Sequence, residues 1–182
     1  ITIGPEDIHK NLETLAYVWK ELGDQGATRH SLMINLGGGM VTDLGGFAAS
    51  TFKRGFQYIN IPTTLLAMVD ASVGGKTGIN FNGLKNEIGV FSPAEYVLID
   101  TEFLKSLDSH NILSGYAEML KHGIISTTEH WAELLNFDLN QIDYKALQQL
   151  VAHSVSIKED IVEKDPFEKN IRKALNLGHT VG

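Results

Sequence analysis

Three short apolar runs, separated by segments long enough for helices, constrain the fold of this chain most strongly. They read SLMINL (31–36), QYINI (57–61) and YVLID (96–100). Each run has the length of a buried strand, and strands separated by helix-length segments indicate a parallel sheet with helices on its faces. The sequence therefore predicts an α/β fold for this part of the chain.

The flanking regions differ in character. The chain opens with a short strand candidate, followed by NLETLAYVWKEL, whose apolar residues recur at helical spacing up to Gly23. From residue 109 onward there is no strand-like alternation, and the apolar residues again follow helical spacing. We predict an α/β domain over residues 1–107 and the start of an all-helical domain over residues 108–182. Because the chain begins with Ile and ends in LNLGHTVG, we expect it to be a piece of a longer protein.

The composition argues against several classes of protein. A hydrophobic content of 43% is ordinary for a globular core, and a net charge of −7 argues against a nucleic-acid-binding surface. Without cysteine there is no disulfide or thiolate metal site, so a metal would need His, Asp or Glu. No apolar run reaches the length of a membrane span and the start has no signal-peptide pattern. We therefore expect a cytoplasmic protein with no nucleic-acid or membrane partner.

A glycine-rich turn, GGGMVTDLGGF, directly follows the first predicted strand. A strand, a glycine turn and a helix in succession are typical of nucleotide-binding α/β units, in which a helix N-terminus meets a phosphate. The usual G-x-G-x-x-G pattern fails, because Thr42 stands at the third glycine position counted from Gly37. The turn therefore indicates either a nucleotide site of another kind or tight packing of the turn.

The stretch from Pro62 to Asn86 concentrates polar groups after a buried apolar run, LLAMV. Its glycines let backbone N–H groups approach an anion, and its lysines supply positive charge. GGKT resembles the end of a phosphate-binding P-loop, but Asp70 stands at that motif's first glycine and would repel phosphate. A solvated surface loop is the alternative. The polar side chains are Thr63, Thr64, Asp70, Lys76, Asn80, Lys85 and Asn86.

The helical part carries two further groups. Glu118, Lys121 and His122 share one helix face, and the small apolar frame GYAEML predicts a buried Glu118 that needs a cation or metal. His122 has the spacing of a second ligand, but packing or capping near the helix end is the interpretation we favour. A surface ion pair between Glu118 and Lys121 is the alternative.

The second group lies in RKALNLGHT, where Arg172, Asn176 and His179 follow helical spacing. A guanidinium and an amide suit a carboxylate, and a neutral imidazole suits zinc. An exposed basic helix end is the alternative. The remaining histidines have no partner pattern and are expected to be structural or at the surface: His9, His30, His110, His130 and His153.

Taken together, these motifs resemble 3-dehydroquinate synthase. GGGMVTDLGGF, RGFQYINIPTTLLAMVDASVGGKTGIN, KNEIGVFSP, GYAEMLKHG and RKALNLGHT occur in the family's order and cover nearly the whole chain. The resemblance implies a Rossmann-like NAD-binding domain followed by a helical metal- and substrate-binding domain, with zinc or cobalt. The implied reaction belongs to the shikimate pathway and converts 3-deoxy-D-arabino-heptulosonate 7-phosphate to 3-dehydroquinate and phosphate. It proceeds by transient oxidation by NAD, phosphate elimination, re-reduction and intramolecular aldol closure.

The resemblance also implies roles for individual residues. Substrate-contacting or catalytic positions match Asp70, Lys76, Asn86, Lys121, Lys158, Arg172, Asn176 and Arg54. NAD-contacting positions match Asp7, Lys10, Gly37, Gly38, Gly39, Asp43, Thr63, Thr64, Lys76, Lys85, Phe103 and Ser106. Metal-ligand positions match Glu118 and His179, with His122 outside the metal's first shell and a third ligand beyond Gly182.

Two other features follow from the resemblance. In the family, the arginine matched by Arg54 reaches the substrate phosphate from a neighbouring subunit, so a homodimer is expected. Arg172 and Asn176 suit a substrate carboxylate, which disfavours a related sugar-phosphate cyclase such as 2-deoxy-scyllo-inosose synthase. That cyclase remains an alternative, as does an inactive piece that only binds NAD.

Overall fold

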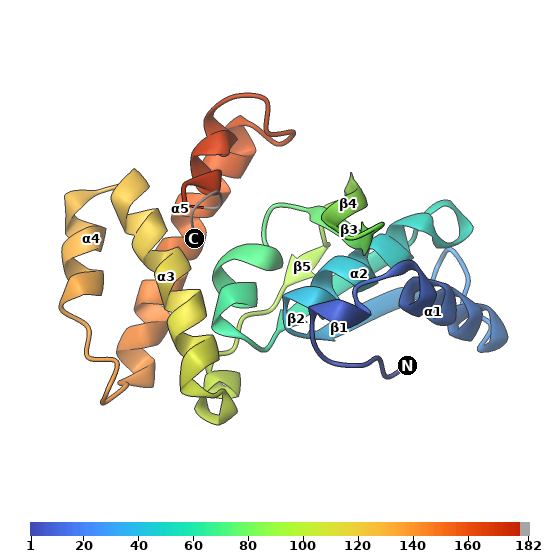
Figure 1. The fold of residues 1–182 in the computed structure, drawn as a ribbon, viewed down its shortest axis with the longest axis horizontal. Coiled ribbons are helices and arrows are strands. Elements are labelled where there is room, and N and C mark those ends of the chain that lie inside the picture. The colour runs from blue at the N-terminus through green and yellow to red at the C-terminus, as the bar shows by residue number, and fades with distance from the viewer. Residues whose placement is uncertain (179–182) are drawn as a thin grey trace. The chain divides into compact units, whose positions relative to one another are not determined.

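The computed structural model describes residues 1–178 and divides into two compact units, shown as a ribbon in Figure 1. Unit 1 comprises Ile1–Thr63 and Gly75–Asp100. Unit 2 comprises Thr64–Gly74 and the chain from Thr101 onward. The compact units therefore assign the segment 64–74 to the helical part, whereas the predicted boundary near residue 107 is a single cut. That boundary stays a prediction.

Unit 1 contains the predicted parallel sheet. Its strands are β1 (Leu32–Gly37), β2 (Gln57–Pro62) and β5 (Tyr96–Val97), in the order β1-β2-β5, and both pairings are parallel. The parallel α/β arrangement is confirmed. The third strand is shorter than YVLID predicted, because the ladder beyond Val97 continues only as one bond from Leu98 N to Asn60 O, at 2.9 Å.

Two helices complete the core of unit 1. In α1 (Leu12–Asp24), the Asn11 side chain accepts a hydrogen bond from Thr14 N at 2.9 Å and so caps the first turn. The second helix, α2 (Gly39–Thr51), follows β1 directly. The prediction of a strand at the start of the chain is wrong, because the only regular element within residues 1–11 is a 3₁₀ turn at Asp7–His9. The core side chains of this unit include Leu15, Val18, Leu44, Phe47, Ala48 and Ile79.

An antiparallel hairpin, which the sequence did not predict, occupies much of the polar stretch. It pairs β3 (Lys76–Phe81) with β4 (Leu84–Phe91). Gly78 lies opposite Gly89, and a Cβ on Gly89 would lie 2.1 Å from Thr77 O, so the two backbones approach as closely as glycine allows. Every residue of β4 is exposed, which removes the one-sided burial pattern by which strands are recognised.

The described residues of unit 2 form helices joined by loops and contain no strand. Three α-helices, α3 (Ser109–Ile125), α4 (Thr128–Leu135) and α5 (Tyr144–Lys164), are each capped by the side chain that precedes them. The segment RKALN forms a 3₁₀ helix, Ile171–Asn176, in place of a full α-helical turn. The remaining helical turns are Ala67–Ala71 and Thr101–Ser106.

Small residues allow α3 to pack closely within unit 2. A Cβ on Gly115 would lie 2.5 Å from the backbone nitrogen of Leu66, so α3 lies directly against the 64–74 segment. The hydroxyl of Tyr116 donates to Leu134 O at 2.7 Å and ties α3 to the end of α4. Within residues 1–178, no helix is both long enough and apolar enough to span a membrane.

Candidate functional site

The glycine turn of unit 1 joins β1 to α2. Gly37 ends β1, and Gly38 is the N-cap of α2 and provides no side-chain cap. A Cβ on Gly37 would lie 2.6 Å from Val41 Cγ2, so the turn has no room for a side chain. The N–H groups of the first turn of α2 therefore depend on backbone, solvent or an anion for hydrogen bonds, as in phosphate-binding helix starts.

Polar groups from three distant segments meet beside this turn, and we call them the Lys10 cluster: Asp7, Lys10, Asp43, Asn80, Lys85 and Asn86. The ammonium group of Lys10 pairs with the Asp43 carboxylate and donates to Asn86 Oδ1. The Lys10 side chain is only 6% exposed, whereas Asp43 is 19% exposed. Since a buried ammonium needs partners, Asp43 and Asn86 hold Lys10 in place.

The outer part of the Lys10 cluster is more exposed. Asn80 Nδ2 donates to Asp7 Oδ2 at 3.1 Å, and Lys85 Nζ lies 3.2 Å from the same oxygen. Asn86 N donates to Asn80 Oδ1 at 2.9 Å. The resemblance assigned Asn86 to the substrate and Asp7, Lys10, Asp43 and Lys85 to NAD, yet all of them lie in this one cluster.

Two more expected site residues of unit 1 are exposed. Lys76 begins β3. Arg54 has a positive φ of 70° and lines an open pocket together with Arg29, His30 and Glu95. The three basic side chains give this pocket a composition that suits an anion.

In unit 2, Lys158 of α5 pairs with Asp70. The Lys158 ammonium donates to both the carboxylate and the backbone carbonyl of Asp70, and the two side chains are 6% and 30% exposed. Burial by itself would raise the pKa of Asp70, but the charge of Lys158 and its hydrogen bond hold this pKa below its ordinary value. Burial lowers the pKa of Lys158, and the nearby charge of Arg172 acts in the same direction.

Glu118 and its neighbours extend this group of buried charges. Glu118 is 9% exposed and pairs with the Lys121 ammonium, which also donates to Leu175 O. His122 Nε2 lies 3.5 Å from Glu118 Oε1. Apart from the ion pair of Glu118 Oε1 with Lys121, neither this oxygen nor either ring nitrogen of His122 has a hydrogen-bond partner within residues 1–178.

The position of Glu118 fits a metal ligand, since a buried carboxylate needs a cation and is a donor that zinc takes. The predicted burial of Glu118 is observed. Of the two interpretations favoured for His122, packing or capping near the helix end, the structure agrees with packing, because the imidazole lies in the last turn of α3 and is fully buried. The expected ligand His179 lies outside the described residues.

Arg172 is almost fully buried, with 2% exposure. Its guanidinium donates to Pro166 O at 2.6 Å and to Gly74 O at 2.8 Å. Asn176, in contrast, is exposed, and its amide pairs with Glu168. We refer to four buried charged residues and the partly exposed Asp70 as the Lys158 cluster: Asp70, Glu118, Lys121, Lys158 and Arg172.

Three residues expected to contact NAD belong to unit 2. Thr64 Oγ1 accepts from Ala67 N at 3.2 Å, and Ser106 Oγ donates to Phe103 O at 3.2 Å. Thr63, in unit 1, donates its backbone N–H to Gly37 O at 2.9 Å. Their contacts are local, and their expected roles stay predictions.

Sequence reasoning missed one group of side chains. His130 is buried and His153 is partly exposed, as expected, but both lie against Glu133, a partner that was not expected for either. The spacing of His130 and Glu133 on one helix face was a signal, whereas the partner His153 follows 20 residues after Glu133 and could not be inferred from spacing.

Comparison with known proteins agrees with these features. The family models described as 3-dehydroquinate synthase N-terminal and C-terminal match residues 1–114 and 115–182. A 3-dehydroquinate synthase of Parabacteroides distasonis is 60% identical over 97% of this chain, and one of Pyrococcus furiosus is 45% identical over 100%. The chain covers 50% and 53% of these two relatives, so it spans about half of their length.

Solved structures give the same result for the fold. A 2-epi-5-epi-valiolone synthase from Streptomyces hygroscopicus, solved with NAD+ and Zn2+, matches with a TM-score of 0.90 and 31% identity over 97% of this chain and 51% of its own. A 2-deoxy-scyllo-inosose synthase, solved with carbaglucose-6-phosphate, NAD+ and Co2+, matches with a TM-score of 0.89 and 26% identity, over 97% of this chain and 48% of its own. The predicted α/β, Rossmann-like class is thereby confirmed. From its sequence and from the fold of both units, this chain belongs to the 3-dehydroquinate synthase family.

Proposed function

We propose that the protein containing this chain is a 3-dehydroquinate synthase of the shikimate pathway, dependent on NAD and on zinc or cobalt. It would convert 3-deoxy-D-arabino-heptulosonate 7-phosphate to 3-dehydroquinate and phosphate. The observation that carries this proposal is the Lys158 cluster, in which three buried cations accompany two carboxylates within a chain 60% identical to a named 3-dehydroquinate synthase. A buried excess of positive charge favours an anionic substrate.

NAD and the metal ion would be held by different residues. The uncapped start of α2 with Gly37, Gly38 and Gly39 suits a pyrophosphate, and Asp43 suits a ribose hydroxyl. Glu118, with His179, would hold the metal ion. When bound, NAD supplies reversible hydride transfer and the metal supplies Lewis acidity.

The residues of the Lys158 cluster would bind and orient the substrate. Lys158 and Arg172 are close enough for the charge of one to affect the pKa of the other, and together they suit the substrate carboxylate. Asp70, kept ionised by Lys158, would accept a hydrogen bond from a ring hydroxyl. The Lys158 ammonium already donates to the Asp70 carboxylate. When the substrate binds, the N–H groups of Lys158 would therefore have to be divided between Asp70 and the substrate carboxylate.

Assembly and location are further parts of the proposal. We infer a homodimer in which the exposed Arg54, beside Arg29 and His30, binds the substrate phosphate of the partner's site. A cytoplasmic location is part of the same proposal. The substrate would be a small sugar phosphate.

A phosphate-release assay on the full-length protein tests the proposal. We expect turnover with the heptulosonate phosphate and none with a hexose 6-phosphate, which lacks the carboxylate. Turnover of the hexose phosphate alone would favour a related cyclase, and NAD binding with no turnover of either would favour an inactive NAD-binding protein.

Two substitutions test the proposed role of Arg172 in substrate binding. Arg172→Lys should raise KM for the heptulosonate phosphate by at least about tenfold, since a bidentate guanidinium is lost. Lys173→Gln, one residue away and exposed, is the matched control and should leave KM unchanged. Equal KM values in both variants would contradict the role of Arg172.

A further inference from the structure

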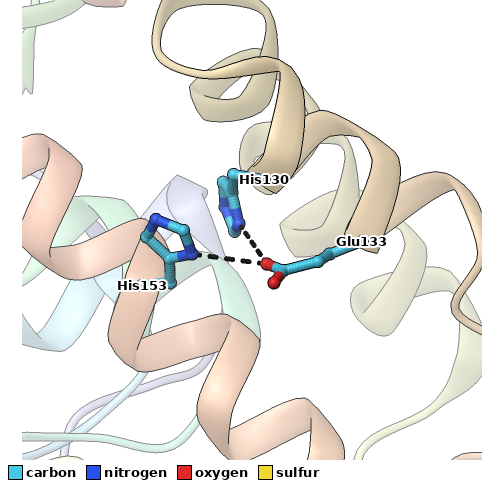
Figure 2. A group of neighbouring side chains, drawn as sticks. All are labelled: His130, Glu133 and His153. Carbon is cyan, nitrogen blue, oxygen red and sulfur yellow. Dashed lines mark hydrogen bonds and ion pairs between the residues drawn. The ribbon is translucent and has the colours of Figure 1, made fainter.

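We propose that His130 and Glu133 of α4, together with His153 of α5, form a second divalent-metal site that binds zinc and joins the two helices. This donor set is separate from Glu118 and does not depend on the proposed catalytic function. The three residues come from two helices of unit 2, as Figure 2 shows.

The distances fit metal coordination better than hydrogen bonding. A single oxygen, Glu133 Oε2, lies 3.4 Å from His130 Nδ1 and 3.4 Å from His153 Nδ1 (Figure 2), and all three donor atoms lie within 4.8 Å of one another. A strong N–H···O bond is shorter, near about 2.9 Å. In a tetrahedral zinc site with bonds of about 2.0–2.1 Å, neighbouring ligand atoms are about 3.4 Å apart.

The helices position the donors. His130 and Glu133 are three residues apart on α4 and therefore share one face of that helix. The two imidazole rings lie close, with centroids 4.1 Å apart and planes inclined by 44°. The rings are thus neighbours without stacking, and both direct Nδ1 to the same carboxylate oxygen.

A second contact supports metal binding by His130. Its other ring nitrogen, Nε2, lies 3.0 Å from Ser154 Oγ, and both groups are fully buried. When Ser154 Oγ accepts this bond, the proton is on Nε2 and the lone pair of Nδ1 faces Glu133 Oε2. In this tautomer a cation between the two lone pairs would remove their repulsion, and such an outer bond is usual for metal-binding histidines.

The exposure of the ligands gives the ion an entry path. His130 is fully buried, whereas the side chains of Glu133 and His153 are 53% and 41% exposed. An ion here would have three protein ligands and keep water at its open position. Its effect would be structural, because it would link α4 to α5.

Zinc content of the full-length protein tests this site. We expect Glu133→Gln and His153→Gln each to bind one zinc ion fewer per chain than the unsubstituted protein after equilibration with Zn2+, measured by native mass spectrometry. Both side chains are half-exposed, so these variants should fold. Glu129→Gln, an exposed carboxylate on the same helix outside the donor set, is the matched control and should keep the full zinc content.

Thermal unfolding provides a second readout. Added Zn2+ should raise the melting temperature of the Glu129→Gln protein by more than that of the Glu133→Gln protein, since only the former retains the link between α4 and α5. Equal zinc content in the Glu133, His153 and Glu129 variants, or equal melting shifts, would overturn the proposal. In that case His130, Glu133 and His153 form a hydrogen-bonded group only.

Discussion

Asp165, directly after α5, holds a turn together through its carboxylate. Its two oxygens accept backbone N–H groups from Lys169 at 2.9 Å, Asn170 at 2.6 Å and Arg172 at 3.1 Å. Burial would raise the pKa of Asp165, but these three bonds lower it below the ordinary value. The turn positions Arg172, so this carboxylate acts on the Lys158 cluster through the backbone.

The lowered pKa of Asp165 predicts a pH-dependent stability. A carboxyl whose pKa is lower in the folded state contributes stability above its unfolded pKa of about 3.9 and loses it as the pH falls through the folded pKa. Asp165→Asn should therefore lower the urea midpoint at pH 7. Below the folded pKa, the midpoints of variant and unsubstituted protein should converge. A constant difference at all pH values would show that the charge of Asp165 is not what matters.

The Lys158–Asp70 pair predicts an asymmetric response to substitution. Asp70→Ala leaves the ammonium of Lys158, 6% exposed, without its carboxylate, and should cost about 3 kcal/mol of unfolding free energy. Lys158→Met removes the buried charge and keeps the side-chain volume, and the remaining Asp70 carboxylate, 30% exposed, can be solvated. The Lys158→Met variant should therefore lose less unfolding free energy than Asp70→Ala. Denaturant unfolding of the two variants checks the order. A greater loss in Lys158→Met would contradict this account.

At the scale of elements, the hairpin β3–β4 depends on a close approach of two glycines. Gly89→Ala would bring a Cβ within 2.1 Å of Thr77 O. Because a backbone atom cannot move aside without disturbing the hairpin, we expect the free energy of unfolding to fall by about 2–3 kcal/mol. Gly23→Ala in α1 is the control, because a Cβ there meets nothing within 4 Å. This substitution should raise the free energy of unfolding by about 0.5 kcal/mol. Chemical unfolding measures both, and equal effects would contradict the packing argument.

The elements also show what the sequence could predict. The parallel sheet followed from apolar runs of strand length, and the burial of Glu118 followed from its small apolar neighbours. The hairpin was missed because β4 is exposed on both faces, so its residues carry no alternation of burial. The partners Asp70 and Lys158 are 88 residues apart, and only the fold brings them together. The residue roles taken from the family resemblance stay predictions.

At the scale of the whole molecule, binding of NAD should be linked to stability. A ligand at 100 times its Kd stabilises the folded state by about 2.7 kcal/mol. Asp43→Asn retains a polar side chain beside Lys10 but loses the charge, and should weaken NAD binding by about 1–3 kcal/mol. The melting temperature of the full-length variant should therefore rise less on addition of NAD. Glu13→Gln, an exposed carboxylate of α1, is the control, and an equal rise in both proteins would exclude Asp43 as an NAD contact.

The discontinuous make-up of the units has a consequence for shuffling genes within this family. Since residues 64–74 belong with the helices and residues 75–100 with the sheet, the chain passes from one unit to the other at three points. A chimera with one crossover near residue 107 would inherit Asp70 from one parent and Lys158 from the other, although both lie in unit 2. A transplant of unit 2 as a whole therefore needs three junctions, at 63/64, 74/75 and 100/101, and recombination that ignores the first two splits this ion pair between parents.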